Sequence, residues 1–422
     1  MTLFSRKREY FIVSLLLISF YFSIILSFGY FHKLNDIMFW SPDSQTYRAV
    51  GNWLCGLDKT NTTLDALLIR PFFYPLFLNL SRSFGGVYGV WFFQFLMWVS
   101  GGLLIYYVVK NNTGSAILAL GSSLIYGSNL TLILITLHAL TETMTTFLLA
   151  ILVFLISDAR QHQKVYWPLV IFVTALLTVT KPVYVLLLIG VLGYWFYLLI
   201  QDIYYKKNKF GKTYYSIFLY VILALLPVFI QISIMKTTHN RFTISEIGSR
   251  TIKGFYFARL YKQVNHVSMQ EAWEKTKPFD KKRAVKFILK HYKFSILLYF
   301  TLIKENLVAG SNFVNYPRTQ KLLDRYMKIL NKIYYYFHLL MIIPLAWTII
   351  SLAKKKKKED LEIIVFLAGV LYLVIFTSGV TFGQGDRIVL PTLPVWITLY
   401  ALLITKFNAN FARPKIKTQN TT

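Results

Sequence analysis

Residues 87–109 read VYGVWFFQFLMWVSGGLLIYYVV, a run of 23 residues without a charged side chain. The hydrocarbon core of a bilayer is about 30 Å thick and requires roughly 20 apolar residues per helical span. Other runs of comparable length follow along the 422 residues, of which 55% are hydrophobic and 15% are charged. The pattern predicts an all-α integral membrane protein that crosses a bilayer many times.

Charge-poor runs predict about ten membrane spans. They cover residues 10–30, 87–109, 116–136, 139–157, 168–180, 183–200, 216–235, 333–353, 361–382 and 389–405. Three basic residues precede the first run, and no small-residue cleavage pattern follows it, so we expect an uncleaved span rather than a signal peptide. Pro182 predicts a break between the fifth and sixth runs.

Basic loops fix the expected orientation, because short loops rich in Lys and Arg stay cytoplasmic. With the N-terminus inside, all the strongly basic short segments fall inside: Lys110, 160–164, 206–212, 354–358 and the tail from Lys406. The other side then holds 31–86, the tips near His138 and Lys181, 236–332 and 383–387. We therefore expect a multi-pass protein of the plasma (inner) membrane with an extracytoplasmic site.

Three regions follow from this pattern. Residues 1–235 form an N-terminal transmembrane catalytic module that includes the first outer loop, 31–86. Residues 236–332 form a long extracytoplasmic segment, and 333–422 contain the C-terminal spans and a basic tail. Within the middle segment, Arg283 to Leu307 predicts an amphipathic interfacial helix with Val285, Ile288, Leu289 and Tyr292 on its apolar face.

Positive charge is concentrated in the middle segment. The chain has a formal net charge of +28, from 46 Lys and Arg against 18 Asp and Glu, and residues 236–332 contribute +14 of it. This segment is too long for the short-loop rule. Membrane lipids and an anionic lipid-linked substrate are the expected partners. Nucleic acid is not, because the basic residues lie between spans and no nucleic-acid motif accompanies them.

The first outer loop contains a charged helix start. Ser41 before Pro42 is typical of an N-cap, which places Asp43 in the first turn of a helix that ends near Leu54. A capping role alone is the structural alternative for Asp43. Arg70 follows in a segment rich in proline and aromatic residues. An interfacial aromatic belt explains the rings, but it does not explain a pairing of Asp43 with Arg70.

These motifs resemble those of a known group of membrane enzymes. Asp43-Ser44 with Tyr47 and Ala49, then Arg70-Pro71 with Tyr74-Pro75-Leu76, resembles the first outer loop of GT-C glycosyltransferases of the protein O-mannosyltransferase and lipid A aminoarabinose transferase type. Glu142 at the start of the fourth span, Lys181-Pro182 and the segment 284–291 fit the same resemblance. Ser44 departs from it, because those families carry a second acidic residue there.

The resemblance implies a GT-C-like fold and a polyprenyl-phosphate-linked sugar as donor. The acceptor is then a hydroxyl of an envelope lipid, glycan or protein. Such a transfer needs a carboxylate to take the acceptor proton and cations to hold the departing phosphate. The expected catalytic residues are Asp43 and Glu142. The expected substrate-binding residues are Tyr47, Arg48, Arg70, Tyr74, Lys181 and Arg387.

Structural alternatives accompany several of these residues. Glu142 at a span edge is also compatible with a solvated interfacial residue, and Lys181 with a side chain that snorkels to head groups. Residues 383–387 have the composition of a turn. Metal use stays open, with a divalent cation as one possibility. His138, His266 and His291 lack the spacing of a metal site, and the single Cys55 excludes an internal disulfide.

Three other classes of membrane protein are alternatives to a glycosyltransferase. A transporter normally has related halves and polar residues at midplane depth, whereas the span interiors contain little beyond Gln94, Gln231 and His338. A polysaccharide polymerase or ligase also uses lipid-linked glycans, and the sequence separates this alternative only weakly from a glycosyltransferase that moves a single sugar. A membrane scaffold has no need to gather carboxylates and cations at one face.

Overall fold

The computed structural model describes residues 3–58, 60–162, 166–205, 212–310, 320–381 and 384–411, and within these ranges it contains helices and no strand. The first half comprises α1 (Leu3–Ser27), η1 (Phe31–Lys33), α2 (Leu34–Met38), α3 (Pro42–Leu54), α4 (Asn61–Leu67), α5 (Phe73–Ser83), α6 (Gly86–Thr113), α7 (Ala116–Gly127), α8 (Leu130–Ile135), α9 (Glu142–His162), α10 (Trp167–Thr180), η2 (Pro182–Tyr184) and α11 (Val185–Tyr205). The second half comprises α12 (Lys212–Ala224), α13 (Leu226–His239), α14 (Ile247–Thr251), η3 (Ile252–Phe257), α15 (Ala258–Asn265), α16 (Met269–Thr276), α17 (Lys281–Lys290), α18 (Tyr292–Val308), α19 (Gln320–Leu340), α20 (Ile342–Lys354), α21 (Lys358–Ser378), η4 (Gly385–Ile388), η5 (Leu390–Thr392) and α22 (Leu393–Phe411). The all-α prediction is confirmed.

Six helical stretches of the described chain are long and apolar enough to cross a membrane. They are Lys7–Ser27, Gly86–Thr113, Pro182–Gln201, Arg325–Lys354, Glu359–Ser378 and Leu390–Phe407. The pair Ser216–Ala224 and Leu226–His239, bent by 47°, makes a seventh if it counts as one span. Several apolar helices thus support a multi-pass membrane protein, but the predicted number of about ten spans is not confirmed.

The predicted run 116–136 illustrates the difference in span number. Its first part, α7, contains only 12 residues and ends at Gly127. The Asn129 side chain then accepts a hydrogen bond from the Leu132 backbone nitrogen at 2.9 Å and caps α8. An Asn cap inside an apolar run therefore starts a new helix. The apolar helix α10 is also short, with 14 residues.

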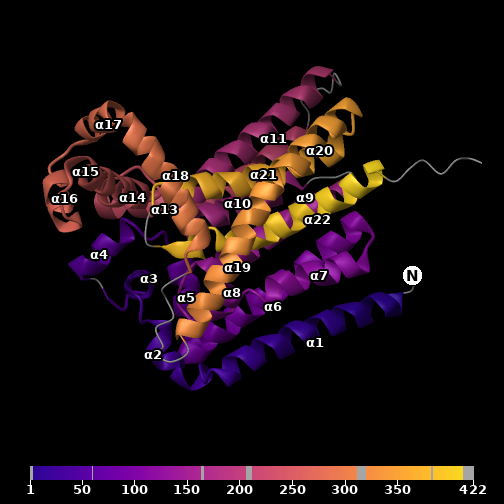
Figure 1. Ribbon diagram of the computed structural model, residues 1–422, viewed down its shortest axis with the longest axis horizontal. Helices are drawn as coiled ribbons and strands as arrows, with labels where there is room; N and C mark the ends of the chain where they lie inside the picture. Colours follow the sequence, from indigo (N-terminus) through magenta and orange to yellow (C-terminus); the bar gives the residue numbers. More distant parts are fainter. Residues whose placement is uncertain are drawn as a thin grey trace, which may run out of the picture.

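The long helices lie side by side, with α6 packed on α1, α7, α9 and α22 (Figure 1). The apolar window of α22 is 78% buried and that of α1 only 22%, so α22 lies in the middle of the bundle and α1 at its edge. The short helices α2–α5 and α14–α17 gather at one end of the bundle, and the N-terminus lies toward the other end (Figure 1).

The segment expected as one amphipathic helix from Arg283 to Leu307 is two helices. The chain leaves helical geometry at His291, where φ is −111° and ψ is 37°, and this residue separates α17 from α18. Leu289 and Tyr292 are 68% and 54% exposed, so apolar side chains do lie on the outer surface here. The single-helix expectation was wrong because an apolar period continues across the break.

The native cysteine provides a direct test of sidedness. Cys55 is exposed and follows α3 in the first predicted outer loop. We expect an impermeant maleimide to label Cys55 in intact cells. In a Cys55→Ser background, a cysteine at the exposed position Lys356 should be labelled only after the membrane is permeabilised. Equal labelling of both positions in intact cells contradicts the orientation.

Candidate active site

Asp43 is positioned by the start of α3. The Ser41 hydroxyl accepts a hydrogen bond from the Ser44 backbone nitrogen at 3.1 Å, and Pro42 occupies the first helical position. This is the cap that the Ser-Pro pair predicts. Asp43 and Tyr47 lie one helical turn apart, and they therefore project from the same face of α3.

Arg70 meets this face because α3 and α5 approach closely. A Cβ atom on Gly51 would lie 2.6 Å from the carbonyl oxygen of Pro75, so only glycine allows the observed contact between the two helices. Arg70 forms an ion pair with Asp43, and its Nε donates to the Thr46 hydroxyl at 3.0 Å. Its guanidinium carbon lies 4.5 Å from the centre of the Tyr47 ring. The predicted pairing of Asp43 with Arg70 is present.

Glu142 is the first residue of α9 and its side chain is 1% exposed. The preceding turn is held from two sides. The Ala139 backbone nitrogen donates to the Met38 carbonyl at 2.9 Å, at the end of α2. The amide nitrogen of Gln94, in the first third of α6, donates to the backbone carbonyls of Thr136 and His138, each at 3.0 Å. A buried polar side chain within α6 thus fixes where α9 begins.

Arg387 belongs to η4, and its guanidinium group contacts both carboxylates. Its Nε lies 2.6 Å from Glu142 Oε1, and its Nη2 lies 2.5 Å from Asp43 Oδ2. Gly385 allows this approach, since its φ is +61° and a Cβ atom there would lie 2.7 Å from the Gly310 carbonyl oxygen. Lys181, between α10 and η2, completes the group with its Nζ 3.3 Å from Glu142 Oε1.

These five side chains, Asp43, Arg70, Glu142, Lys181 and Arg387, are called the ion network below. Three cations and two carboxylates alternate along it, which leaves one net positive charge. Burial alone raises the pKa of the Asp43 carboxyl, but the guanidinium groups of Arg387 and Arg70 outweigh burial and lower it below its usual value. Burial lowers the pKa of the Lys181 ammonium group. An anion that neutralised the excess charge would stabilise this arrangement.

The remaining predicted site residues lie at different distances from the network. Tyr47 is buried and its hydroxyl accepts from Arg70 Nη1 at 3.1 Å. Tyr74 lies behind it, edge-on at 5.1 Å between ring centres. Arg48 is exposed and stacks on Phe39, with its guanidinium carbon 5.1 Å from the ring centre.

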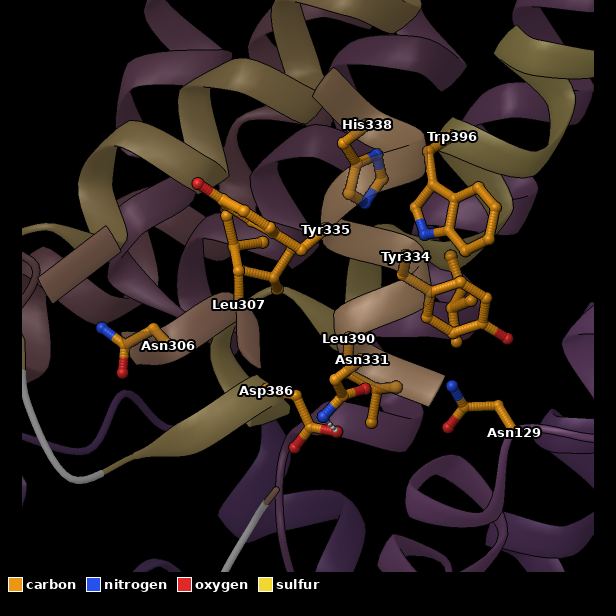
Figure 2. Close-up of a pocket in the computed structure, with 12 residues that line it drawn as sticks. Asn129, Asn306, Leu307, Asn331, Tyr334, Tyr335, His338, Asp386, Leu390 and Trp396 are labelled. Atoms are coloured by element: carbon orange, nitrogen blue, oxygen red, sulfur yellow. Dashed lines mark hydrogen bonds between the residues drawn. The ribbon is translucent and has the colours of Figure 1, made fainter. Parts of the chain in front are cut away.

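Asp386, which lies in the predicted outer segment 383–387, makes its contacts away from the ion network. Its Oδ2 accepts hydrogen bonds from the Thr131 hydroxyl and from the Asn331 amide, both at 2.9 Å. Figure 2 shows the contact with Asn331. Thr46, Thr131 and Asn331 were not predicted to support the site. A polar residue within or beside an apolar helix is the one signal that could have identified Asn331 and Thr131.

Metal-binding residues do not gather in the described ranges. No three His, Cys, Asp or Glu side chains come together there in a way that could hold a metal ion. His138 is buried four residues before Glu142, and burial lowers the pKa of its imidazole to about 4. The imidazole is therefore neutral at neutral pH.

Comparison with known proteins places part of this assembly in a family. Residues 69–231 match the family model of the dolichyl-phosphate-mannose-protein mannosyltransferases, PMT_2. No curated protein and no solved structure matches the chain. The matched range contributes Arg70, Glu142 and Lys181 to the ion network, whereas Asp43 and Arg387 lie outside it. Residues 69–231 are therefore similar to the dolichyl-phosphate-mannose-protein mannosyltransferases, a family of the GT-C superfamily of membrane glycosyltransferases.

Proposed function

We propose that this chain is a glycosyltransferase that moves a sugar from a polyprenyl-phosphate donor to an acceptor hydroxyl at the extracytoplasmic face of the membrane. The acceptor belongs to an envelope lipid, glycan or protein. The observation that carries the proposal is the ion network, in which three cations surround two carboxylates with one positive charge in excess. A sugar phosphodiester carries one negative charge and matches that excess.

In this proposal the donor phosphate takes the place of the Asp43 carboxylate beside the cations. In the free protein Asp43 is held by Arg70 and Arg387, which makes it a weak base. When the phosphate oxygens take up the donors of Arg387, Arg70 and Lys181, Asp43 loses its counter-charges and becomes more basic. Arg is suited to this role because its planar fork of donors matches phosphate oxygens. Substrate binding thus switches on the base.

The chemical step then follows. The acceptor oxygen attacks the anomeric carbon of the sugar, and the bond from that carbon to the phosphate oxygen breaks. The bonding electron pair leaves with the polyprenyl phosphate, whose growing charge the cations stabilise. The hydroxyl proton passes to the Asp43 carboxylate. Phosphate is already a good leaving group and needs no general acid.

The two carboxylates have different roles in this proposal. The Asp43 side chain is 28% exposed and the Glu142 side chain is 1% exposed. Because the Asp43 side chain is the more exposed of the two, an acceptor hydroxyl can reach it, and we assign Asp43 as the base. Glu142 contacts Arg387 at 2.6 Å and Lys181 at 3.3 Å and serves as a positioning residue for the two cations.

The proposal is tested by determining which class of sugar donor the protein uses. The purified protein in proteoliposomes is given a panel of radiolabelled polyprenyl-phosphate hexoses, or the corresponding nucleotide sugars, together with an envelope extract as the acceptor source. We expect label to move to the extract from at least one polyprenyl-phosphate hexose and from none of the nucleotide sugars. Transfer from the nucleotide sugars alone overturns the proposal.

A further inference from the structure

The helix α17 packs one face on the protein and leaves the opposite face uncovered. On the packed face, the Phe287 ring lies 5.6 Å from the ring of Phe257 and 5.5 Å from that of Tyr261, measured between ring centres. On the opposite face, Val285 and Leu289 are 53% and 68% exposed. Residues four positions apart share one face of a helix. These two side chains therefore form an exposed apolar stripe.

A row of lysines lies beside the apolar stripe. Lys282, Lys286 and Lys290 also recur every four residues, and all three are exposed. Lys286 follows Val285 by one residue, so the row is rotated by about 100° from the stripe. Between residues 281 and 293 the chain has six basic residues and no acidic one. The stripe and the row together are called the α17 surface below: Lys282, Val285, Lys286, Leu289 and Lys290.

The carboxylates of the same extracytoplasmic segment are engaged with other groups. Within the described part of residues 236–332, four ion pairs join Glu246 with Arg241, Glu305 with Arg259, Glu271 with Lys275 and Glu274 with Lys277. The Asp280 carboxylate accepts a hydrogen bond from the Arg283 backbone nitrogen at 2.7 Å and caps α17. None of these described carboxylates forms an ion pair with a lysine of the α17 surface, so its positive charge faces outward.

The next helix, α18, lies across the end of a candidate span. The Tyr299 hydroxyl donates to the Phe376 carbonyl at 2.7 Å, and the Asn306 amide donates to the Ser378 carbonyl at 2.9 Å. These contacts are about 10 Å apart along α18 but only about 3 Å apart along α21. The helix α18 therefore crosses the end of α21 instead of running beside it (Figure 1).

This crossing gives the depth of α17. In the predicted orientation, Ser378 is at the extracytoplasmic end of the span Glu359–Ser378. The helix α17 leads directly into α18 and lies with the other short helices at this end of the bundle (Figure 1). The α17 surface is therefore expected at the level of the outer lipid head groups.

We propose that the α17 surface docks on anionic phospholipids of the outer leaflet. Its apolar stripe lies at the boundary of the acyl chains, and its lysines lie beside the lipid phosphates, as in helices that rest in a membrane interface. An acidic polymer in solution would pair with the lysines but would leave Val285 and Leu289 in water. This role is separate from the proposed sugar transfer, because no residue of the α17 surface belongs to the ion network.

A fluorophore at position 289 tests the proposal in the full-length protein. Leu289→Cys is made in a Cys55→Ser background, which removes the native exposed cysteine, and is then labelled. The protein is reconstituted in nanodiscs of phosphatidylcholine, with or without phosphatidylglycerol, that contain lipids spin-labelled on the acyl chain. These lipids quench a fluorophore that reaches the acyl region. We expect strong quenching with phosphatidylglycerol and weak quenching with phosphatidylcholine alone.

Removing charge from the α17 surface should release it from the membrane. With Lys286→Gln and Lys290→Gln together, we expect the docking equilibrium constant to fall about thirtyfold, at about fivefold for each lysine near an anionic surface. Lys275→Gln with Lys277→Gln is the matched control. It removes the same charge from the same segment, but from lysines that pair with Glu271 and Glu274. Its quenching should equal that of the parent.

Three results would overturn the proposal. The first is equal quenching in the two kinds of nanodisc, and the second is equal quenching in the two lysine variants. The third is a fluorophore that responds to soluble polyphosphate but not to phosphatidylglycerol, which would assign the α17 surface to an acidic polymer. Sugar transfer is not measured in these experiments, so their outcome is independent of the proposed function.

Discussion

Asp43→Asn should lower the turnover number for sugar transfer by a factor of about 10²–10⁴, the usual contribution of a general base. The substitution keeps the shape of the side chain and one oxygen that accepts from either Arg70 or Arg387, while its NH2 group cannot accept from the other arginine, and it removes the carboxylate that accepts the proton. The initial rate of transfer from a polyprenyl-phosphate hexose in proteoliposomes measures the effect.

Asp36→Asn is the matched control for this experiment, since Asp36 is an exposed residue of the neighbouring helix α2. Its rate should equal that of the parent. Thermal unfolding shows whether the Asp43 variant is folded. If a folded Asp43→Asn protein turns over at near the parent rate, Asp43 has no catalytic role and its ion pairs with Arg70 and Arg387 are structural alone.

Replacing Arg387 should give the second large loss. In Arg387→Gln the cation that contacts both Asp43 and Glu142 is removed, and we expect the turnover number to fall about 10²–10³-fold, as when one donor to a developing negative charge is removed. Arg387→Lys retains the charge but offers one nitrogen in place of the Nε and Nη2 pair. It should therefore recover only part of the rate.

Two further variants calibrate that result. Lys181→Gln removes a single contact at 3.3 Å and should weaken the apparent affinity for the donor about tenfold. Arg241→Gln removes an arginine that is 65% exposed and pairs with Glu246 and not with a network residue, and it should behave as the parent. An Arg387→Gln protein that is folded and fully active contradicts the role given to the ion network.

Local signals in the sequence predicted the part of the site that lies on α3. The Ser41-Pro42 pair fixes where the helix starts, and the period of 3.6 residues places Asp43 and Tyr47 on one face. The same period could have excluded Arg48 from that face, because it follows Tyr47 by one residue and is rotated by about 100°. Its position on Phe39 agrees with the helical geometry.

Local sequence patterns could not predict contacts between residues that are far apart in the sequence. Arg387 meets Asp43 across 344 positions, and sidedness alone predicted only that both face the same side of a membrane. Adjacent residues of a tight turn point in different directions, so the sequence did not separate Asp386 from Arg387. Gly385 allows this orientation through a close approach to the Gly310 carbonyl oxygen, which composition does not reveal.

The number of spans could not be derived from hydropathy. Apolar runs identified the six long helices, but they also merged α7 with α8 across the Asn129 cap. Short apolar helices such as α7 and α10 pack against α6 and α9 within the bundle. Their hydrophobicity therefore reflects burial in protein as well as contact with lipid, and the two causes give the same sequence pattern.

In this account the ion network binds the phosphate of a lipid-linked donor. Phosphate binding is measured most directly by comparing polyprenyl phosphate with the uncharged polyprenol of equal chain length. The affinity for each lipid is measured with the purified parent protein and with Arg387→Gln. We predict that the parent binds the phosphate form at least about tenfold more tightly than the polyprenol, and that Arg387→Gln loses most of this difference. Equal affinity of the parent for both lipids would contradict the account.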